Sequence, residues 1–236
     1  MNPFLGEFIG TMLLIIMGDG VVANVVLNKT KGNNSGWIVI TFGWAMAVFL
    51  GVFASVKLGG GGHLNPAVTI AMAAFNPDFD SSLLPTYVGA QFAGAVVGAI
   101  VVWLAYKQHF DETTDSNAKL AVFSTGPAIR NTAYNLITEG IGTFILVFGA
   151  LAMSRPASAL GTLEALPVAL LILGIGLSLG GPTGYAINPA RDLGPRIAHF
   201  ILPIRNKRDS DWGYSWIPVV GPVIGALIAA YLFKLL

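Results

Sequence analysis

The sequence predicts an all-α membrane protein of six transmembrane helices and two half-helices that enter the membrane without crossing it, arranged as an inverted repeat of three helices plus three. Three observations predict this fold class: a strongly apolar composition, six apolar stretches of membrane-spanning length, and two Asn-Pro-Ala tripeptides in matching positions. Of the 236 residues, 54% are hydrophobic and only 11% are charged, whereas about 25% of residues are charged in an ordinary soluble domain.

The remaining composition narrows the function classes. The formal net charge is +1 and the basic residues form no continuous tract, which argues against a nucleic-acid-binding surface. The chain has no cysteine, so disulfides, thiol nucleophiles and cysteine metal sites are excluded. The first residues lack the basic region and the cleavage site of a secretory signal. We therefore expect the first apolar stretch to be a transmembrane helix.

Six apolar stretches have the length of a transmembrane helix, which needs about 20 residues to cross the hydrocarbon core. They cover residues 4–27, 36–56, 83–106, 134–153, 163–179 and 214–235. The connections outside the half-helices cover residues 28–35, 107–133, 154–162 and 203–213. None of these connections is long enough to fold as a separate domain. The sequence therefore predicts a single membrane domain over residues 1–236.

Two further apolar segments are too short to span and begin with Asn-Pro-Ala after a glycine-containing run. They extend from Asn65 to about Phe75 and from Asn188 to about Leu202. Asparagine is a favoured N-cap, proline is favoured at the first helical position, and the residue before proline is held extended. Within lipid, irregular backbone is tolerated only where protein buries it or where it lines a watery cavity. The two segments therefore indicate a pore or a binding site, and the alternative is two ordinary loops that share a tripeptide.

The order of these motifs is repeated along the chain. Glu-x-x-Gly-Thr starts at Glu7 and again at Glu139, and each copy is followed by Asn-Pro-Ala and then by a helix rich in small residues. With three full spans in each half, the second copy enters the membrane from the opposite side. The positive ends of the two half-helices then converge near the midplane. We place the first repeat at about 1–110, the second at about 130–236 and a linker at about 107–133.

Three acidic residues lie at least three residues inside a predicted span, where an ionisable side chain is costly and usually has a partner. We interpret Glu7 and Glu139 as acceptors of hydrogen bonds from the unwound loop of their own half, with proton relay as the alternative. Asp19 lies about 18 Å further along the first helix than Glu7, which indicates a position near a watery vestibule. Contact with a solute and plain hydration are both open for Asp19.

Two longer motifs identify a family resemblance: GHLNPAVT at residues 62–69 and GYAINPARDLGPR at residues 184–196. With both Glu-x-x-Gly-Thr segments, they resemble the major intrinsic proteins, and within that family the glycerol facilitators or aquaglyceroporins. The resemblance covers essentially the whole chain and implies an aquaporin-like fold, with residues 1–236 forming one channel domain. It implies a homotetramer with one pore in each subunit, in the plasma or inner membrane, with both termini cytoplasmic. Counting Lys and Arg in the loops favours the opposite orientation, so the cytoplasmic termini rest on the resemblance.

The function that the resemblance implies is passive. It is a channel for glycerol, other small neutral solutes and water that excludes ions and protons, with no cofactor, no metal site, no catalytic site and no nucleic-acid partner. Dihydroxyacetone and undissociated lactic acid are further solutes that the sequence does not rank against glycerol.

The resemblance places the selectivity filter at four residues, which are Phe42, Gly176, Tyr185 and Arg191 here. Arg191 would offer fixed N–H donors and a permanent charge that repels cations, and the two aromatic rings would offer apolar faces. The alternative for both rings is packing against lipid or protein. Gly176 would leave open the space that histidine typically fills in water-selective relatives. Asp192 would brace the loop and widen the filter, or would act only as a first-turn acid that favours the half-helix dipole.

The resemblance also supplies partners for a solute that passes in single file. The donors are the side-chain amides of Asn65 and Asn188. The acceptors are backbone carbonyls of the unwound runs, at Gly61, Gly62, His63, Gly184, Tyr185 and Ala186. The side chain of His63 is interpreted as holding its loop, with a metal ligand or a pH switch as the alternatives.

Three other functions compete with a glycerol channel. A water-selective pore is disfavoured by Gly176 and Asp192. An ion-coupled secondary transporter also uses inverted repeats and broken helices, and it would need Glu7 or Glu139 as its ion site. An enzyme is least favoured, because the sequence shows no nucleophile paired with a base and no metal-ligand cluster.

Overall fold

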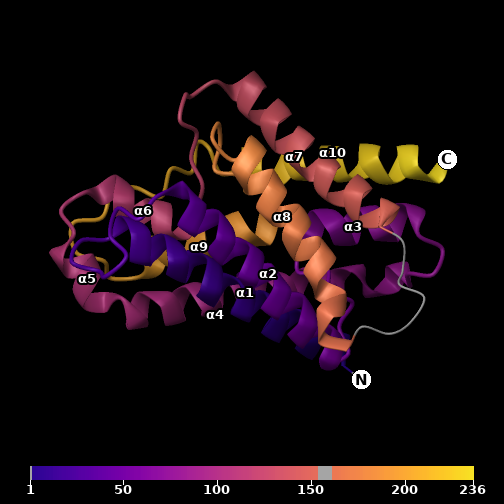
Figure 1. Cartoon of the computed structure of the whole chain (residues 1–236), viewed down its shortest axis with the longest axis horizontal. Helices are drawn as coiled ribbons and strands as arrows, with labels where there is room; N and C mark the ends of the chain where they lie inside the picture. Colours follow the sequence, from indigo (N-terminus) through magenta and orange to yellow (C-terminus); the bar gives the residue numbers. More distant parts are fainter. Residues whose placement is uncertain (1, 154–160) are drawn as a thin grey trace.

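The computed structural model describes residues 2–153 and 161–236, and all regular secondary structure in these ranges is helical (Figure 1). Within them, five helices are long and apolar enough to cross a membrane: α1 (Pro3–Val26), α2 (Trp37–Lys57), α4 (Leu84–Ala105), α7 (Thr132–Ala152) and α10 (Ile217–Lys234). Their bounds lie within a few residues of the predicted spans. The predicted all-α class is confirmed.

The span predicted over residues 163–179 corresponds to a shorter helix. A 3₁₀ turn, η2 (Gly161–Ala165), leads into α8 (Leu166–Leu179), which has only 14 residues. Most of the connection predicted over residues 154–162 lies outside the described residues. The two half-helices are present as α3 (Pro66–Phe75) and α9 (Pro189–Ile201), and η1 (Ser81–Leu83) joins α3 to α4.

The predicted linker contains two short helices, α5 (Lys107–Glu112) and α6 (Ser116–Phe123). Asp115 caps α6 by accepting a hydrogen bond from the backbone N–H of Asn117 at 2.8 Å, which is the usual role of aspartate at an N-cap. Both short helices lie at one end of the molecule, whereas the two chain termini lie toward the other end, well apart from one another (Figure 1).

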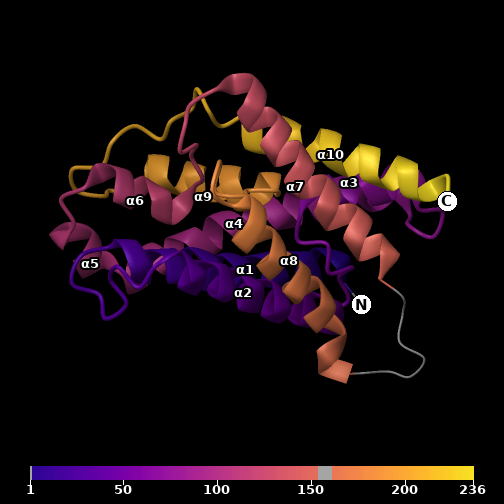
Figure 2. The same ribbon diagram turned by 45° about the horizontal axis from the view of Figure 1, so that its top comes forward.

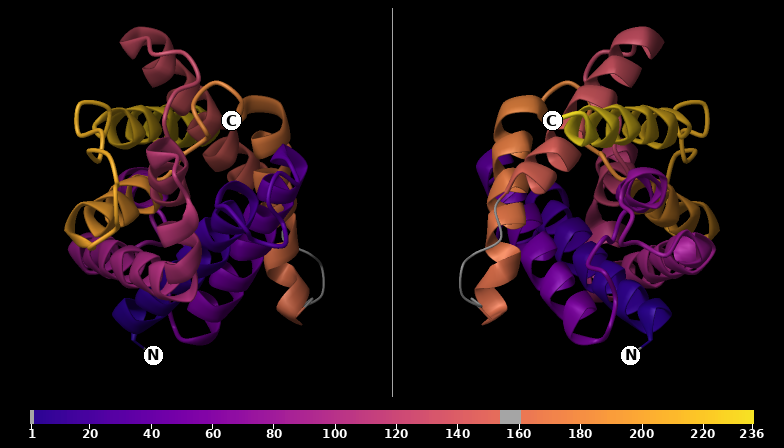
Figure 3. Two further views of the ribbon diagram at one scale, coloured as in Figure 1. Left: turned by 90° about the vertical axis from the view of Figure 1, so that its left-hand side faces the viewer. Right: turned by 90° about the vertical axis from the view of Figure 1, so that its right-hand side faces the viewer.

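Each half-helix packs mainly on a long helix of the other repeat, with fewer contacts to its own. Within the repeats, α1 packs against α2 and α4, and α7 packs against α10 and α8; across them, α2 packs against α8. The half-helices are exchanged, because α3 contacts α10 and α9 contacts α4. In Figure 2, α9 and α3 follow one another along the long axis of the molecule, and the end-on views of Figure 3 show the long helices arranged around that axis.

Glycines allow the long helices to approach closely. A Cβ atom on Gly98 of α4 would lie 2.7 Å from the backbone oxygen of Met12 and 2.9 Å from Cβ of Ile15, both on α1. A Cβ on Gly60 would lie 2.9 Å from the backbone nitrogen of Glu7. The glycine run before the first half-helix therefore lies directly against α1, which gives a packing reason for glycine at position 60.

We predict that Gly98→Ala lowers the stability of the protein by about 1–3 kcal/mol, because the added carbon must push two backbones apart. Gly89→Ala is the matched control in the same helix, since a Cβ at Gly89 meets no atom within 4 Å. The midpoint of thermal unfolding in detergent measures the difference. Equal midpoints for the two variants would contradict close packing of α1 on α4.

Candidate functional site

The two half-helices begin at their asparagines, as the sequence predicts. The side-chain oxygen of Asn65 accepts a hydrogen bond from the backbone N–H of Ala67 at 2.9 Å. The side-chain oxygen of Asn188 accepts from the N–H groups of Ala190 at 3.0 Å and Arg191 at 3.2 Å. Each cap satisfies backbone donors at the start of a helix, a contribution of about 1 kcal/mol.

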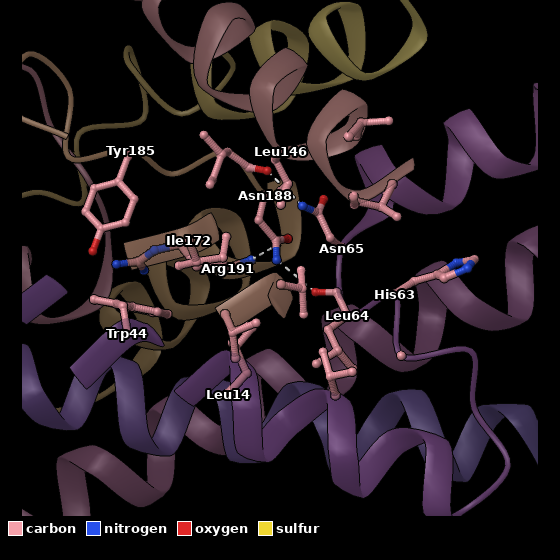
Figure 4. A pocket seen from close by; sticks show the side chains of 18 of the residues that line it. Leu14, Trp44, His63, Leu64, Asn65, Leu146, Ile172, Tyr185, Asn188 and Arg191 are labelled. Atoms are coloured by element: carbon pink, nitrogen blue, oxygen red, sulfur yellow. Dashed lines mark hydrogen bonds between the residues drawn. The ribbon is translucent and has the colours of Figure 1, made fainter. Parts of the chain in front are cut away.

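The same two asparagines tie the loops to each other. The Asn65 amide donates to the backbone oxygen of Ile187 at 2.8 Å, and the Asn188 amide donates to the backbone oxygen of Leu64 at 2.8 Å (Figure 4). The two half-helix starts therefore meet head to head. Each amide has a second N–H, for which we find no partner within the described residues.

The residue before each asparagine has an unusual backbone conformation. Leu64 has φ of 51° and Ile187 has φ of 43°, which is left-handed and especially uncommon for a β-branched residue. Such a conformation costs about 1–3 kcal/mol and persists only where the surroundings fix it. In both loops, what fixes it is a buried carboxylate.

Glu7 and Glu139 are these carboxylates, and each accepts from two consecutive N–H groups. Glu7 accepts from His63 at 3.1 Å and Leu64 at 2.8 Å. Glu139 accepts from the backbone N–H groups of Ala186 at 3.1 Å and of Ile187 at 2.8 Å. The hydrogen bonds expected from the loop-support interpretation are therefore present in both halves.

The side chain of His63 is held by its neighbours. Its Nδ1 lies 3.2 Å from the hydroxyl of Thr69, and its ring lies 5.3 Å from that of Phe79 and 5.1 Å from that of Tyr87 between centroids. No group of three or more His, Cys, Asp or Glu that could hold a metal ion is found in the described part of the chain. These contacts fit a side chain that fixes the loop.

A cavity of about 290 Å³ runs past both loops. One side is formed by loop residues, which include Gly62, His63, Gly184, Tyr185 and Ala186. The carbonyl oxygens of these five residues accept no hydrogen bond from the described residues, so they are available to a solute. Gly61, the sixth predicted carbonyl residue, does not line the cavity.

The opposite side of the cavity is apolar. It is formed by side chains from α1, α2, α3, α7 and α8, namely Leu14, Trp44, Val48, Val52, Val68, Met72, Leu146, Val147, Ala150, Leu151, Val168 and Ile172. The cavity thus has a polar stripe facing an apolar wall.

Arg191 lies at one end of this cavity. Its guanidinium carbon stands 4.0 Å from the centroid of the Trp44 ring, a cation–π contact. Its Nη1 donates to the carboxylate of Asp19 and to the backbone oxygen of Phe123, both at 3.3 Å. Figure 4 shows the guanidinium between the side chains of Tyr185 and Trp44. The Tyr185 hydroxyl is buried and has no hydrogen-bond partner in the described residues.

Phe42 lies neither in this cavity nor beside Arg191, so the predicted position of Phe42 is wrong. Its side chain is 52% exposed and lines an outer groove beside Met17 and Met46. Trp44 occupies the place instead, because residues two apart on a helix point about 200° away from one another. A signal existed in the sequence: Trp44, Val48 and Val52 recur every four residues and line the cavity together.

Gly176 is buried beside the constriction but does not line the cavity. Its backbone oxygen accepts from the indole N–H of Trp37 at 3.0 Å. A Cβ here would lie 2.9 Å from Cζ and 3.0 Å from the hydroxyl oxygen of Tyr185. The missing side chain therefore leaves room for the Tyr185 ring, and Gly176 acts on the cavity through that ring.

Asp192 faces away from the cavity and braces the outer loops. Its Oδ2 accepts from both the N–H and the hydroxyl of Thr125 at 2.7 Å, and its Oδ1 accepts from Nε of Arg196 at 2.9 Å and Nη2 at 2.7 Å. Arg196 also donates to the backbone oxygen of Ser210 at 2.7 Å. This buried ion pair fastens two loops to α9, a role for Arg196 that the sequence motif did not reveal.

Comparisons with known proteins agree with this geometry. A family model described as Major intrinsic protein matches residues 1–233. The chain belongs to the major intrinsic protein family. It is 58% identical to a probable glycerol uptake facilitator protein of Thermotoga maritima, over 99% of both chains. It is 57% identical to a glycerol uptake facilitator protein of Streptococcus pneumoniae strain R6, over 100% of this chain and 99% of the relative.

A solved structure extends the agreement to three dimensions. The aquaglyceroporin from Plasmodium falciparum superposes with a TM-score of 0.86 at 33% identity, covering 99% of this chain and 95% of the other. Since the family is one of membrane channels and several helices are long enough to span, this major intrinsic protein is a multi-pass membrane protein.

We predict that Trp44→Ala increases the flux of a longer polyol such as xylitol by about tenfold, since a bulky wall of a tight passage is removed. Phe42→Ala is the matched control in the same helix and leaves xylitol flux unchanged. Swelling of liposomes in xylitol, monitored by light scattering, measures both. The assignment of Trp44 fails if the Phe42 variant is the one that widens the passage.

Proposed function

We propose that this major intrinsic protein is a passive channel for glycerol, other small neutral solutes and water. The observation that carries the proposal is the cavity with one polar side and one apolar side, with Arg191 at one end between two aromatic rings. Glycerol has hydroxyl groups along one edge and CH groups along the other, so it matches such a passage. The names of the relatives, both glycerol uptake facilitator proteins, support the same solute.

The passage can replace the hydration of the solute step by step. At the constriction, Nε and Nη2 of Arg191 make no hydrogen bond to the described residues, so they can donate to a solute hydroxyl. The loop carbonyls then accept from the hydroxyls, and the free amide N–H groups of Asn65 and Asn188 donate at the junction of the half-helices. Every group in this series binds weakly and is followed by another, which is the condition for rapid exit.

Ions and protons would be opposed at the same places. The positive ends of α3 and α9 meet where Asn65 and Asn188 contact the opposite loop, and converging helix dipoles are unfavourable for a cation. The pore is also too apolar on one side to replace the hydration shell of an ion. A neutral solute is not repelled by the helix dipoles and has no ionic hydration shell to lose.

The remaining parts of the proposal concern assembly and orientation. We place residues 1–236 in one channel domain, which the exchange of half-helices between repeats supports. Both termini lie at the same end of the molecule, which fits a location with both ends in the cytoplasm. The exposed apolar surfaces of the long helices suit contact with lipid and with neighbouring subunits of a homotetramer.

Ion coupling is disfavoured by how the buried acids are used. Besides its two backbone donors, Glu7 accepts from the Ser55 hydroxyl at 3.0 Å and the Gln91 amide at 2.8 Å. A carboxylate with four hydrogen-bond donors is fixed in place and has little left for a transported ion.

Reconstitution in liposomes tests the function. Light scattering would follow volume after gradients of glycerol, of lactic acid near its pKa and of sucrose. The expected result is fast entry of glycerol, no entry of sucrose, and rates that do not change with proton or sodium gradients. Fast water flow without glycerol entry would identify a water-selective pore, and gradient-dependent flux would identify a coupled transporter.

We predict that Gly176→Ala reduces glycerol flux by about tenfold while water flux falls far less, because the new carbon forces the Tyr185 ring toward the passage and a single carbon matters most in a tight site. Gly174→Ala, in the same helix, is the control because its Cβ would meet no atom within 4 Å. Glycerol and water permeabilities are measured on the same vesicles. Equal losses of both would contradict this account of the constriction.

A further inference from the structure

Asp19 is a charged residue that the proposed solute path does not use. It lies in the apolar helix α1, is fully buried, and is absent from the lining of the cavity. It sits behind Arg191, whose Nη1 it contacts at 3.3 Å. Its second carboxylate oxygen is buried and has no partner in the described residues. Asp19 therefore faces one cation, and that cation belongs to the constriction.

The neighbouring charges do not share this role, because they pair with one another. Asp192 and Arg196 form their own buried ion pair at 2.7 Å, and both side chains are fully buried. Of the two buried arginines of α9, one is therefore balanced by Asp192 and the other by Asp19. Without Asp19, the constriction would carry an uncompensated positive charge in a passage of low polarity, where small anions would be attracted.

We propose that Asp19 sets the charge selectivity of the pore: by neutralising Arg191, it prevents the constriction from binding small anions, while the arginine keeps its N–H donors for neutral solutes. This inference rests on the proposed channel function. It adds how the channel separates neutral solutes from small anions. Asp19 is a positioning residue, since it acts through Arg191 and does not contact the solute.

The geometry explains how a paired arginine still serves the solute. Asp19 and the backbone oxygen of Phe123 both bind Nη1, and the guanidinium lies over the ring of Trp44. These three contacts fix one edge and one face of the guanidinium. The other nitrogens, Nε and Nη2, keep their donors. The ion pair thus removes the net charge from the passage without removing its hydrogen bonds.

The test is a change of anion sensitivity in Asp19→Asn, which keeps the shape and one oxygen acceptor but loses the charge. Water and glycerol fluxes into liposomes are measured with external gluconate, a large anion, and then with nitrate, a small one. Each variant is compared with its own flux in gluconate. We expect no effect of nitrate on the original protein and about tenfold inhibition of Asp19→Asn, a size that uncompensated charges produce in binding.

Asp78→Asn is the matched control, because it makes the same chemical change at an exposed residue after α3. It should remain insensitive to nitrate. Insensitivity of Asp19→Asn would overturn the proposal, as would equal sensitivity of the control. A merely structural role for Asp19 would lower flux in both salts alike.

If the Asp19→Asn protein does not insert into the membrane, a variant of Arg191 tests the same proposal from the other side of the ion pair. Arg191→Val leaves the Asp19 charge uncompensated, so its water flux should become sensitive to a small cation such as guanidinium and not to nitrate. The double variant Asp19→Asn with Arg191→Val should be insensitive to both ions. Cation insensitivity of Arg191→Val would overturn the proposal. Because water flux reports the ion effect by itself, failure of glycerol entry in the original protein would reject the proposed function separately.

Discussion

The pore depends on the reciprocal hydrogen bonds between two asparagines and the loops opposite them. Asn65 reaches the backbone of Ile187, and Asn188 reaches the backbone of Leu64. Leu64 and Ile187, which carry those backbone oxygens, are both left-handed, and buried carboxylates accept hydrogen bonds from the N–H groups of the same two residues. The costly backbone, the buried acids and the asparagines thus form one interdependent unit. Removing any one of these groups would leave another buried polar group without a hydrogen-bond partner, which is costly.

The scaffold is nearly symmetric, whereas the chemistry on it is not. Both repeats use a buried glutamate, an asparagine cap and a left-handed residue before the asparagine. After the shared Asn-Pro-Ala they diverge, because the first half-helix continues with Val68 and Thr69 while the second continues with Arg191 and Asp192. The charged constriction therefore forms only at the end of the cavity near α9. The two similar repeats form the passage together. The residues that differ between them, in the second repeat, determine which solutes pass.

Sequence reasoning succeeded where the determinant is local. Asparagine caps, proline at the first helical position and long apolar runs each follow from short stretches, and α3, α9 and the long helices appear where these stretches predict them. It failed where the site depends on the direction of a side chain or on a contact between residues far apart in the sequence. Phe42 was placed in the correct turn of α2 but on the wrong face, and Asp19 meets Arg191 across a separation of 172 residues. The short helices α5 and α6 also went unpredicted, because six to eight residues carry too little periodicity to identify a helix.

The exchange of half-helices has a consequence for how the chain is made. A ribosome delivers the first repeat long before the last helix, yet α3 packs on α10, which is the final helix of the chain. Until α10 enters the bilayer, α3 has only the helices of its own repeat, such as α4, to pack against, and contacts distant in sequence form slowly. The first half-helix therefore reaches its final packing only when both repeats are in the membrane.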